Sequence, residues 1–599
     1  MNRPKRWTIA PVHAAAAELA ARLKTSQITA QVLINRGVVD GEECFRFLQP
    51  SLKCLHEPGL IANVGKAAGR IAEAIRASEQ IVIYGDYDVD GITATAILWH
   101  AIRILGGNVD FYIPHRIDEG YGLNTSAINE IIDRGAKLIV TVDCGVTAVE
   151  QARIAKERGV DLIVTDHHEW HQAAPPLTDD GVSREPILPK AYTIVHPRLE
   201  KDDSGNAAAY PNRNLCGAGV AFKLAWAVGQ ACNGAARVSD AFRAYLVEAT
   251  GLAALGTIAD VVPLTGENRI LARFGLGGLK ASKLTGIQAL IASAGLSGQT
   301  LDSYHVGFLL APRLNAAGRM GHAKLAAEML TVADDAKALE IANYLEEQNR
   351  ERQSVERQIC EQAIEMVQQQ KMDQEDCRAI VLGSDQWHPG VIGIVASRLV
   401  EKFCRPTILV GFNEHGIGQG SGRSIGGFHL AKALEACGEH LQAYGGHEMA
   451  AGLKVMPENF EKFRACFCAY AKEHLEPEHL VPELKLDAEA QLRQVTPAMV
   501  DELQRLAPFG HGNRRPVFCI KGAELAAPPR RVGKTGDHLQ LFVRQGNATM
   551  KAIAFNAGVL FDRLVAGVRI DVAFEPTLNT YNGYTNVELE VKDLHFVDA

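Results

Sequence analysis

Short apolar runs alternate with amphipathic stretches between residues 80 and 165. Helical patterns at 92–105, 125–135 and 147–159 carry apolar residues three and four positions apart, and the last two end at a glycine typical of a helix C-cap. The apolar runs resemble parallel strands that are buried on both faces; they are IVIYG (81–85), VDFYI (109–113), KLIVTV (137–142) and DLIVT (161–165). This alternation predicts an α/β domain with a doubly wound parallel sheet.

A long helical region follows this domain. Helical patterns continue through 215–260 to about residue 340, and the segment 338–370 contains neither glycine nor proline. Its middle, 346–353, is polar on every side, and the segment holds no sustained heptad of apolar residues. The pattern therefore predicts a long, partly solvated helix that connects two lobes, rather than a coiled coil.

The rest of the chain shows two further patterns. Strand-like runs at 379–383 and 406–411, with glycine-dense loops at 416–427 and 444–452, predict a second α/β unit. After 476–483, five short alternating strands predict a small β-barrel, for which the OB-fold is the commonest architecture. At about 150 residues per domain the 599 residues predict roughly four domains. The patterns divide the chain into an N-terminal segment and four further parts, at 1–45, 46–337, 338–372, 373–480 and 481–599.

Composition narrows the functions that remain open. The apolar fraction of 47% and charged fraction of 22% are those of a soluble globular protein. Sixty-two Lys and Arg against seventy Asp and Glu give a net charge of −8, which excludes a uniformly cationic surface, so any nucleic-acid site is local. Twelve scattered cysteines without zinc-site spacing indicate reduced thiols and a cytoplasmic protein. No apolar run is long enough for a membrane helix, and no signal peptide is expected.

Carboxylates and histidines follow the predicted strands at their carboxyl ends. Because these ends meet at one crevice of an open α/β sheet, the side chains are expected to converge. Crowded carboxylates repel one another unless cations compensate them, and oxygen ligands with imidazole suit Mn²⁺ or Mg²⁺. Two such ions about 3.5–4 Å apart are the usual apparatus for attack on a phosphodiester, with Asp143 as the natural bridging residue. The set is Asp86, Asp88 and Asp90, then Asp143, then Asp166, His167 and His168, and finally Asp260 in GTIADVVPL. A single Asp in such a position is usually only a helix cap or a turn residue.

Two clusters are candidates for gripping phosphate. In PRLNAAGR, an Arg pair around small residues suits bidentate contact, although solvated helix-end arginines look the same. In GIGQGSGRSIGG, glycines let backbone N–H groups approach an anion, although hairpin turns look similar. With YGGHEMAAG nearby in sequence, we expect a pocket for a phosphate group, and His388 before a Pro-Gly helix start is either an anion ligand or a cap. The residues concerned are Arg313, Asn315, Arg319, His388, Ser421, Arg423, Ser424 and His447.

A basic stretch lies in the C-terminal region. Between 505 and 534 there are seven basic residues and one acidic residue, and aromatic residues lie in and near this stretch. This composition suits a barrel that binds a single strand by charge and base stacking. Phe518 and Phe542 are expected in the barrel core instead. The predicted nucleic-acid path comprises Phe509, Arg514, Arg515, Arg530, Arg531 and Lys534.

Four motifs carry a family resemblance. GDYDVDG (85–91), VDCG (142–145), TDHH (165–168) and GTIADVVPL (256–264), in this order and spacing, resemble the DHH phosphoesterase superfamily and, within it, the RecJ family of bacterial single-stranded-DNA-specific 5′→3′ exonucleases. Further blocks that look like RecJ extend over nearly the whole chain: IPHRIDEGYGL (113–123), LAPRLNAAGRMG (310–321), WHPGVIGIVASRL (387–399), GSGRSIGGFHL (420–430), YGGHEMAAGL (444–453) and APFGHGNRRPVF (507–518).

The resemblance implies a fold and a site. It implies a DHH domain at 46–337, a connecting helix at 338–372, a DHHA1 domain at 373–480 and an OB-fold nucleic-acid-binding domain at 481–599. His168 would lie beside the scissile phosphate, and Arg116 would join the substrate-binding residues. Asp90 and Asp166 would contact the metal ligands and orient them without binding the metals themselves. The implied ligands of two Mn²⁺ or Mg²⁺ ions are Asp86, Asp88, Asp143, His167 and Asp260.

The resemblance also implies an activity. It implies exonucleolytic release of 5′ mononucleotides from single-stranded DNA, 5′→3′, in DNA repair and recombination. A RecQ-type helicase and a single-stranded-DNA-binding protein would be partners, without a membrane. A hydrolase of short oligonucleotides or cyclic dinucleotides is an alternative, against which the extra barrel and the length argue. A catalytically silent single-strand-binding replication scaffold is another alternative, against which the intact carboxylate set argues.

Overall fold

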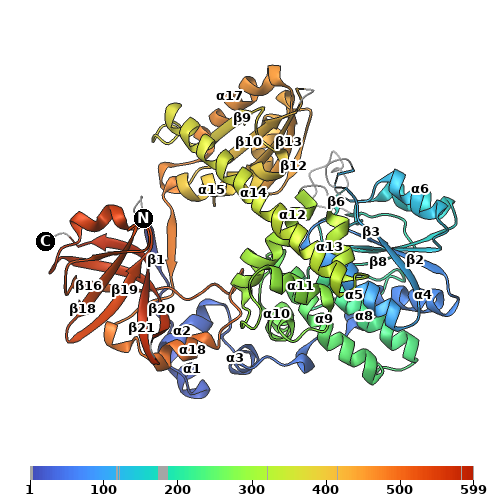
Figure 1. Cartoon of the computed structure of the whole chain (residues 1–599), viewed down its shortest axis with the longest axis horizontal. Coiled ribbons are helices and arrows are strands. Elements are labelled where there is room, and N and C mark those ends of the chain that lie inside the picture. Colours follow the sequence, from blue (N-terminus) through green and yellow to red (C-terminus); the bar gives the residue numbers. More distant parts are fainter. Residues whose placement is uncertain are drawn as a thin grey trace. The chain divides into compact units, whose positions relative to one another are not determined.

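Two units make up the chain (Figure 1). Unit 1 comprises 1–45, 351–506 and 515–599, and unit 2 comprises 46–350 and 507–514. The structure is a computed structural model, and it describes residues 5–115, 119–120, 122–172, 186–319, 322–413, 416–581 and 583–597.

A five-stranded parallel sheet organises unit 2. Its strand order is β3-β2-β4-β5-β8. The chain adds β3 on one side of β2 and then β4, β5 and β8 on the other side, so the order of strand addition reverses at β2. The four strands and three intervening helices predicted between 80 and 165 are confirmed. They are β2 (Gln80–Gly85), α5 (Val89–Ile104), β3 (Asn108–Tyr112), α6 (Thr125–Asp133), β4 (Leu138–Val142), α7 (Val149–Glu157) and β5 (Asp161–Thr165), followed by β8 (Thr193–Val195).

Alternate residues of the strands enter different cores. Ile81 and Ile83 of β2 pack with α4 (Val64–Arg76), α5 and α8 (Gly217–Asn233), whereas Val82 and Tyr84 pack with α6 and α7. Figure 1 shows α6 on one side of the sheet and α4, α5 and α8 on the other. Both faces are therefore covered, which explains the continuous apolar runs and confirms the doubly wound architecture.

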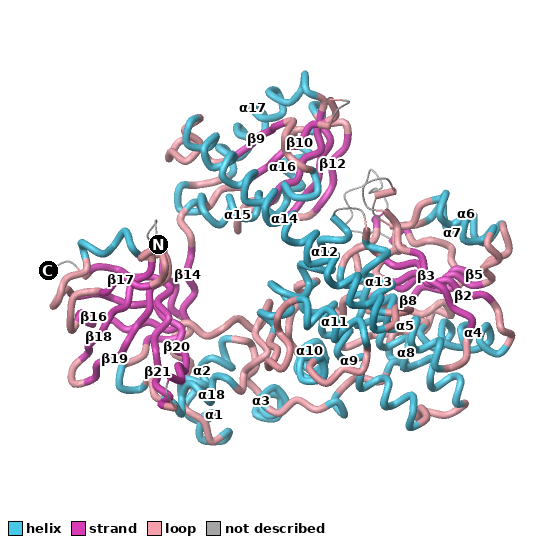
Figure 2. The backbone as a smooth tube through the Cα atoms, viewed as in Figure 1, coloured by secondary structure: helices cyan, strands magenta, loops and turns pink. Residues whose placement is uncertain are grey.

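Helices fill the remainder of unit 2 (Figure 2). The helical region predicted from 215 onward is confirmed. After α8 it comprises α9 (Asp240–Ala259), α10 (Gly266–Leu279), α11 (Thr285–Ser293), the π-helical turn η3 (His305–Leu310), α12 (Ala311–Arg319), α13 (Ala323–Leu330) and the first part of α14 (Asp335–Gln369).

Helix α14 has one buried face and is exposed elsewhere, which confirms the expectation of a partly solvated helix. Asn349, Arg352 and Glu356, which follow helical spacing, are buried although the sequence there is polar on every side. Arg352 and Glu356 form an ion pair at 2.6 Å, and Arg398 also pairs with Glu356. The polar stripe is thus buried by charge pairing, which apolar periodicity does not detect.

A buried ion pair inside unit 2 supports a stability prediction. Lys223 of α8 pairs with Glu267 of α10, both side chains are fully buried, and Glu267 also accepts from Tyr210 Oη at 2.5 Å and His56 N at 2.9 Å. We expect Glu267→Gln to lower the free energy of unfolding by about 3–5 kcal/mol, because it leaves a buried lysine without its carboxylate. Chemical denaturation would measure the change.

The matched control is the exposed pair between Arg213 and Glu200, 3.2 Å apart. Glu200→Gln should change the free energy of unfolding by less than about 1 kcal/mol. Equal effects of the two substitutions would contradict the assigned importance of the buried pair.

A mixed sheet forms the α/β part of unit 1. Its strand order is β12-β13-β11-β10-β9, in which β9 and β10 are parallel and the others antiparallel. Helices α15 (Pro389–Phe403), α16 (Leu430–Ala436) and α17 (Pro457–His474) accompany it. The strands are β9 (Ile380–Ser384), β10 (Thr407–Phe412), β11 (Gly418–Arg423), β12 (Ala443–Gly446) and β13 (Ala450–Val455).

The expectation of glycine-dense loops in this part is wrong at β11, at β12 and in the first half of β13. Residues 418–423 form β11, which pairs with β10 on one side and β13 on the other. A Cβ at Gly418, Gly420 or Gly422 would lie 2.6–2.9 Å from packed apolar side chains, Leu453 and Leu430 among them. Glycine alternates here because its neighbours pack against the strand, and not because the backbone turns.

The C-terminal strands of unit 1 form a closed barrel. Strands β16, β20, β21, β19 and β18 follow one another in the sheet, and β16 also pairs with β18, which closes it. The predicted five-stranded barrel is confirmed, with β15 (Ala488–Glu489) and β17 (Arg530–Val532) added at its edges. Its strands are β16 (Phe518–Leu525), β18 (His538–Gln545), β19 (Ala548–Ala554), β20 (Arg569–Tyr581) and β21 (Tyr584–Phe596).

The N-terminal residues belong to this barrel region. Strand β1 (Arg6–Ile9) pairs in parallel with β14 (Glu483–Leu486), and Trp7 Nε1 donates to Asp593 of β21 at 2.8 Å. After α1 (Ala16–Leu23), helix α2 (Gln27–Asn35) is followed by Arg36, which pairs with the fully buried Asp487 at 2.6 Å. The carboxylate of Glu502 in α18 (Pro497–Gln504) accepts three hydrogen bonds, from Thr29 in the first turn of α2 and from the two residues that precede this helix. Residues 6–36 are therefore an integral part of unit 1.

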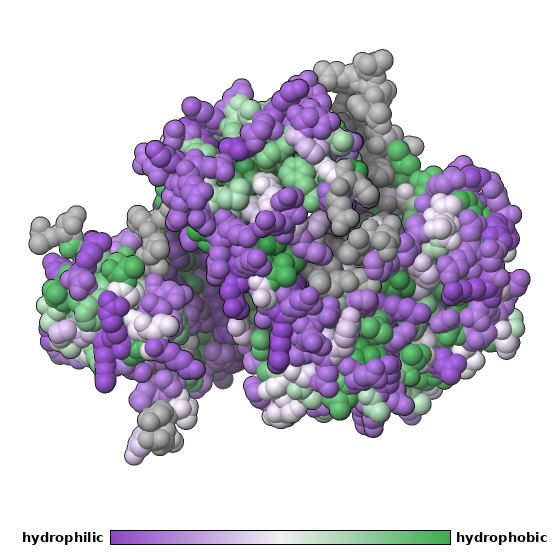
Figure 3. All heavy atoms as spheres, turned by 45° about the horizontal axis from the view of Figure 1, so that its top comes forward, coloured by the Kyte–Doolittle hydropathy of each residue, from purple (hydrophilic) through white to green (hydrophobic). Residues whose placement is uncertain are grey.

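The exterior is mixed in polarity. On the face drawn in Figure 3, hydrophilic side chains predominate and hydrophobic ones are scattered between them. Among the residues that the structure describes, none of the helices combines the length and apolar character needed to cross a membrane.

Candidate metal centre

The carboxyl ends of β2, β4 and β5 bring the predicted acidic residues together. These strands are neighbours in the order β2-β4-β5, so Asp86, Asp143 and Asp166, each directly after its strand, lie along one edge of the sheet. The expected convergence is confirmed. Three groups have potential ligand atoms within 4.8 Å of one another: Asp86, Asp88 and Asp143; Asp143, His167 and His168; and Asp90, His167 and Asp260.

His167 and Asp143 link these groups. Nε2 of His167 lies 3.1 Å from Oδ1 of Asp143, and 3.7 Å from both Oδ2 of Asp90 and Oδ2 of Asp260. Asp260 is the residue after the last turn of α9, so the position of this carboxylate is set by a helix and not by a strand. Asp143 Oδ1, His167 Nε2 and Asp260 Oδ2 are buried without a hydrogen-bond partner. Buried polar atoms without a hydrogen-bond partner are rare in proteins, so these three atoms indicate a site for a bound group.

The electrostatics fit a cation. Burial, together with the neighbouring carboxylates, raises the pKa of Asp143 well above its usual range, and the same causes raise the pKa of Asp260 to about 8. Burial lowers the pKa of His167 to about 4, so its imidazole is neutral and can ligate. Aspartates and a neutral histidine without thiolate ligands form a donor set that suits Mn²⁺ or Mg²⁺.

The backbone around Asp143 is strained and closely packed. Asp143 has φ of +62°, a left-handed conformation that Asp and Asn tolerate better than most residues. A Cβ on Gly217, at the start of α8, would lie 2.5 Å from the Asp143 Cβ. The start of α8 therefore fits directly against this carboxylate, and only glycine allows the approach.

The start of α8 also holds Asp90. Its two carboxylate oxygens accept from Gly217 N at 2.5 Å and Ala218 N at 2.8 Å. Burial raises the pKa of Asp90 above its usual range, and His167 opposes this shift while Asp88 adds to it. Our sequence reasoning missed this helix start, although the glycines in CGAGVAF (216–222) were a signal for close backbone approach.

Asp166 organises the two histidines. It accepts from Val146 N at 2.8 Å, His167 N at 2.7 Å and His168 Nδ1 at 2.8 Å. Burial opposes ionisation, but these hydrogen bonds and His168 lower the pKa of Asp166 to about 2. Burial likewise opposes the charged form of His168, yet the bond to Asp166 raises its pKa to about 9, so this imidazole is cationic at neutral pH. His196, which sequence reasoning also missed, contacts the His168 carbonyl at 2.9 Å.

Helix α12 reaches the loop that carries Asp88. Asp88 caps α5 by accepting from Asp90 N at 2.9 Å, and Asn315 Oδ1 accepts from Val89 N at 3.2 Å. Arg313 behaves differently from the expected phosphate contact, because it is buried and pairs with Glu346 at 2.7 Å. The Arg116 prediction lies outside the described residues, as does the side chain of Arg319.

In unit 1 the predicted anion residues lie on β11 and directly after it, at the N-cap of α15, and between β12 and β13. A Cβ on Gly393 of α15 would lie 2.8 Å from Ser421 Oγ and 3.1 Å from Arg423 Nη2, so these two side chains face the helix. His388 caps α15 by accepting from Gly390 N at 3.1 Å. Ser424 is buried and donates to the Phe428 carbonyl at 2.7 Å, whereas His447 is exposed. The backbone of β11 is used by the sheet, so side chains rather than loop N–H groups are available there.

The barrel aromatics differ in part from expectation. Phe518 is in the core as predicted, but Phe542 is 40% exposed, so its assignment to the core is wrong. Phe509 is buried at 8% exposure and belongs to unit 2, which contradicts its place on a stacking path of the barrel. The physical reason is that 507–514 packs on unit 2, where Arg269 donates to the Ala507 carbonyl at 2.8 Å and Leu264 N donates to the His511 carbonyl at 2.8 Å.

The basic residues beyond 514 lie on unit 1. Arg530 and Arg531 are exposed on the edge strand β17, and Lys534 is exposed in the turn that follows. Arg531 lies 4.5 Å from the centre of the Phe561 ring, and Arg515 pairs with Glu575 at 3.4 Å. Arg514 is half-buried and belongs to unit 2. The edge of the barrel thus presents positive charge at β17.

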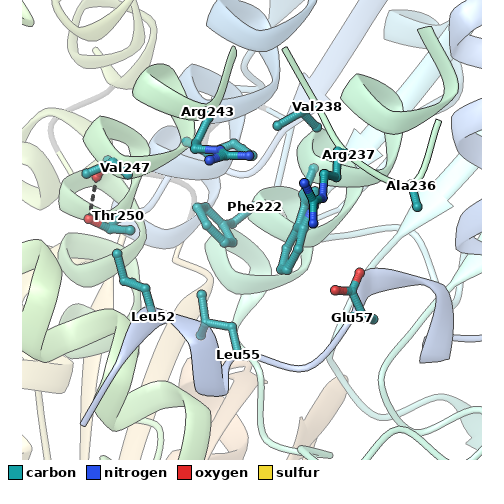
Figure 4. Close-up of a pocket in the computed structure, with 12 residues that line it drawn as sticks. Leu52, Leu55, Glu57, Phe222, Ala236, Arg237, Val238, Arg243, Val247 and Thr250 are labelled. Atoms are coloured by element: carbon teal, nitrogen blue, oxygen red, sulfur yellow. Dashed lines mark hydrogen bonds between the residues drawn. The ribbon is translucent and has the colours of Figure 1, made fainter. Parts of the chain in front are cut away.

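A separate pocket of about 240 Å³ lies in unit 2 (Figure 4). Figure 4 shows Arg237 and Arg243 on one side of Phe222, and Leu52 and Leu55 on the other. None of its lining residues belongs to the carboxylate groups, so this pocket is not the metal centre.

Comparison with known proteins agrees with this geometry. Family models match for the DHH family, N-terminal domain, at 80–257, for the DHHA1 domain at 376–473 and for the RecJ OB domain at 486–593. The chain is 37% identical, over 98% of its length and 70% of the relative's, to single-stranded-DNA-specific exonuclease RecJ of Bacillus subtilis. The chain belongs to the RecJ family. It is 35% identical to RecJ of Thermus thermophilus over 92% of the chain and 73% of the relative.

Solved RecJ structures contain the metals that the donor set suits. The structure of RecJ in complex with Mn²⁺ from Thermus thermophilus matches with a TM-score of 0.81 and 32% identity, over all of this chain and 81% of the other. The structure of that protein with Mg²⁺ matches with a TM-score of 0.73 and 30% identity, over 99% and 79%.

Proposed function

We propose that this protein is a metal-dependent exonuclease that degrades single-stranded DNA 5′→3′ to 5′ mononucleotides. The observation that carries the proposal is the cluster of buried carboxylates around His167, with ligand atoms that lack hydrogen bonds. The curated names of its RecJ relatives, single-stranded-DNA-specific exonuclease, supply the substrate. The polarity rests on the family resemblance.

The residues of the metal centre would have two roles in this reaction, metal binding and charge stabilisation. Asp86, Asp88, Asp143, His167 and Asp260 would hold two divalent ions, and Asp143, which shares one ligand group with Asp86 and Asp88 and another with His167, would contribute to both positions. When bound, the ions would supply a hydroxide at neutral pH and stabilise charge on the phosphoryl group. His168, which Asp166 holds through Nδ1, would stabilise the charge that develops on the phosphate.

Other residues position the strand. Asn315 holds the Asp88 loop through Val89 N, and Arg313 supports the adjoining helices through Glu346. Ser421, Arg423 and His388, with His447, bind the terminal 5′ phosphate in this proposal. Arg530, Arg531 and Lys534 on the barrel attract the phosphate backbone, a contribution that salt weakens.

The family resemblance extends the proposal to the cellular setting. We expect action in DNA repair and recombination in the cytoplasm, with a RecQ-type helicase and a single-stranded-DNA-binding protein as partners. None of the twelve cysteines, all of which lie in the described part of the chain, forms a disulfide.

End-labelled substrates test the activity and its polarity. With Mn²⁺ or Mg²⁺, a 5′ label on single-stranded DNA should appear at once as a mononucleotide, while a 3′ label stays on long fragments. A chelator should abolish release, and blunt duplex DNA should resist. Earlier release of the 3′ label would overturn the polarity, and metal-independent release would overturn the mechanism. Faster hydrolysis of a dinucleotide than of a long strand would favour a short-oligonucleotide hydrolase.

A further inference from the structure

Two aromatic side chains lie exposed and stacked at the start of η3 in unit 2. Tyr304 is 56% exposed and Phe308 is 67% exposed, and their ring centroids are 4.9 Å apart with planes at 27°. Ala311 N donates to the Val306 carbonyl, five residues back, so the turn is π-helical. Pro312 follows and lacks an N–H, which explains the wider turn. Such turns are frequent at functional sites.

Two connections join η3 to the metal centre. The turn continues directly into α12, whose Asn315 contacts Val89 N between Asp88 and Asp90. On its other side, a Cβ on Gly307 would lie 4.0 Å from Cγ2 of Ile258, two residues before Asp260. Seven helical residues from Phe308 to Asn315 span about 10 Å, so the aromatic pair is within reach of the first few nucleotides of a strand held at the metal centre.

The neighbouring surface favours a nucleic acid over an acidic protein. Ser303, next to Tyr304, donates to the carbonyl of Phe509 in the 507–514 segment. This segment carries Arg514 and the exposed His511, and it contains no acidic residue. This segment therefore adds no negative charge beside the aromatic pair, and Asp302, the acidic residue two positions before Tyr304, pairs with His305 at 2.6 Å.

We propose that Tyr304 and Phe308 form a stacking platform for bases of the single strand a few nucleotides from the scissile phosphate. This inference rests on the proposed function. A base stacks on the exposed aromatic pair whatever its identity, because every base has a π-face. Bases of a duplex are already stacked on their neighbours and paired, so they gain no such contact. The platform thus contributes to selectivity for single strands.

The test replaces the two aromatic rings by aliphatic side chains. Tyr304→Leu, Phe308→Leu and the double variant keep apolar volume but lose the π-face. In chelator, the double variant should bind a 5′-phosphorylated single strand about tenfold more weakly, the scale of a lost base–aromatic stack. A run of abasic positions at nucleotides two to five should weaken wild-type binding similarly and add nothing in the double variant. Tyr192→Leu, before β8 at the opposite end of the sheet, is the control and should bind normally.

The outcomes separate the platform from the proposed function. Two results would contradict the stacking platform: wild-type affinity for the single strand in the correctly folded double variant, or weaker binding of the abasic strand by that variant. Cleavage of single-stranded DNA by the wild type would still support the proposed function in either case. If the double variant instead loses a wild-type dimer in sedimentation, the pair is a self-association surface and the platform fails. If the wild type cleaves no single strand with Mn²⁺, the proposed function fails by itself.

Discussion

Asp143→Asn is expected to abolish exonuclease activity, by at least about 10³-fold, while single-strand binding in chelator stays within about twofold of wild type. Asp143 belongs to two of the three ligand groups, so its loss removes a ligand from both proposed ion positions. Asn is the appropriate replacement because it tolerates the left-handed backbone, with φ of +62°. Steady-state hydrolysis with Mn²⁺ and equilibrium binding without it measure the two effects.

The same substitution should stabilise the metal-free protein. Burial and neighbouring carboxylates raise the pKa of Asp143 above its value in the unfolded chain. A carboxyl with a raised folded-state pKa favours folding at low pH and disfavours it progressively as pH rises, so at pH 7–8 it is a destabilising group. In chelator at pH 7.5, Asp143→Asn should therefore melt above wild type, whereas added Mn²⁺ should raise the melting temperature of wild type much more. Full activity, or an unchanged Mn²⁺ effect on melting, would contradict the assigned role.

Asp166→Asn should lower the turnover rate by about 10–100-fold, the usual effect of losing a residue that orients metal ligands. The Asp166 carboxylate accepts from the backbone N–H groups of Val146 and His167 and from Nδ1 of His168, so it sets the position of both histidines. An amide of the same shape carries no charge and cannot match all of these donors. The Mn²⁺ concentration for half-maximal activity should rise with the loss of turnover, which a general loss of stability would not produce.

Asp161→Asn is the matched control for Asp166→Asn. Asp161 begins the strand that Asp166 follows, and its carboxylate binds Arg70 at 2.7 Å away from the metal centre. The control should alter stability by less than about 1 kcal/mol and leave the Mn²⁺ dependence unchanged. A normal Mn²⁺ dependence in Asp166→Asn would show that the histidines do not depend on this carboxylate.

The metal centre could be predicted from sequence because local patterns determine it. Asp143 and Asp166 come directly after apolar runs, and the rule that parallel strands share one carboxyl edge brings them together. The contacts that hold Asp90 could not be predicted in this way. They come from the first N–H groups of α8, more than 120 residues away, and their only local signal is a pair of glycines.

Glycine and charge patterns were less reliable than apolar patterns. Glycines at 418, 420 and 422 predicted a loop, but they form a strand whose neighbours pack too closely for a side chain. The polar residues at 346–353 predicted a partly solvated helix, which is confirmed, but they did not indicate the buried face on which Arg352 pairs with Glu356. Leu453, which packs against Gly420, and Arg398, which pairs with Glu356, are distant in sequence, so a local pattern carries no information about these partners.

The pairing of β1 with β14 has a consequence for the order of folding. Residues 6–9 find their partner strand at 483–486, after all of 46–350 has been synthesised. Unit 2 can therefore fold most of its core during synthesis, since domains generally fold as units at that stage. During this time residues 6–9 have no partner strand. The exposed β1 strand and the apolar face of α2 are then the segments of the nascent chain that remain open longest to chaperones and to mispairing.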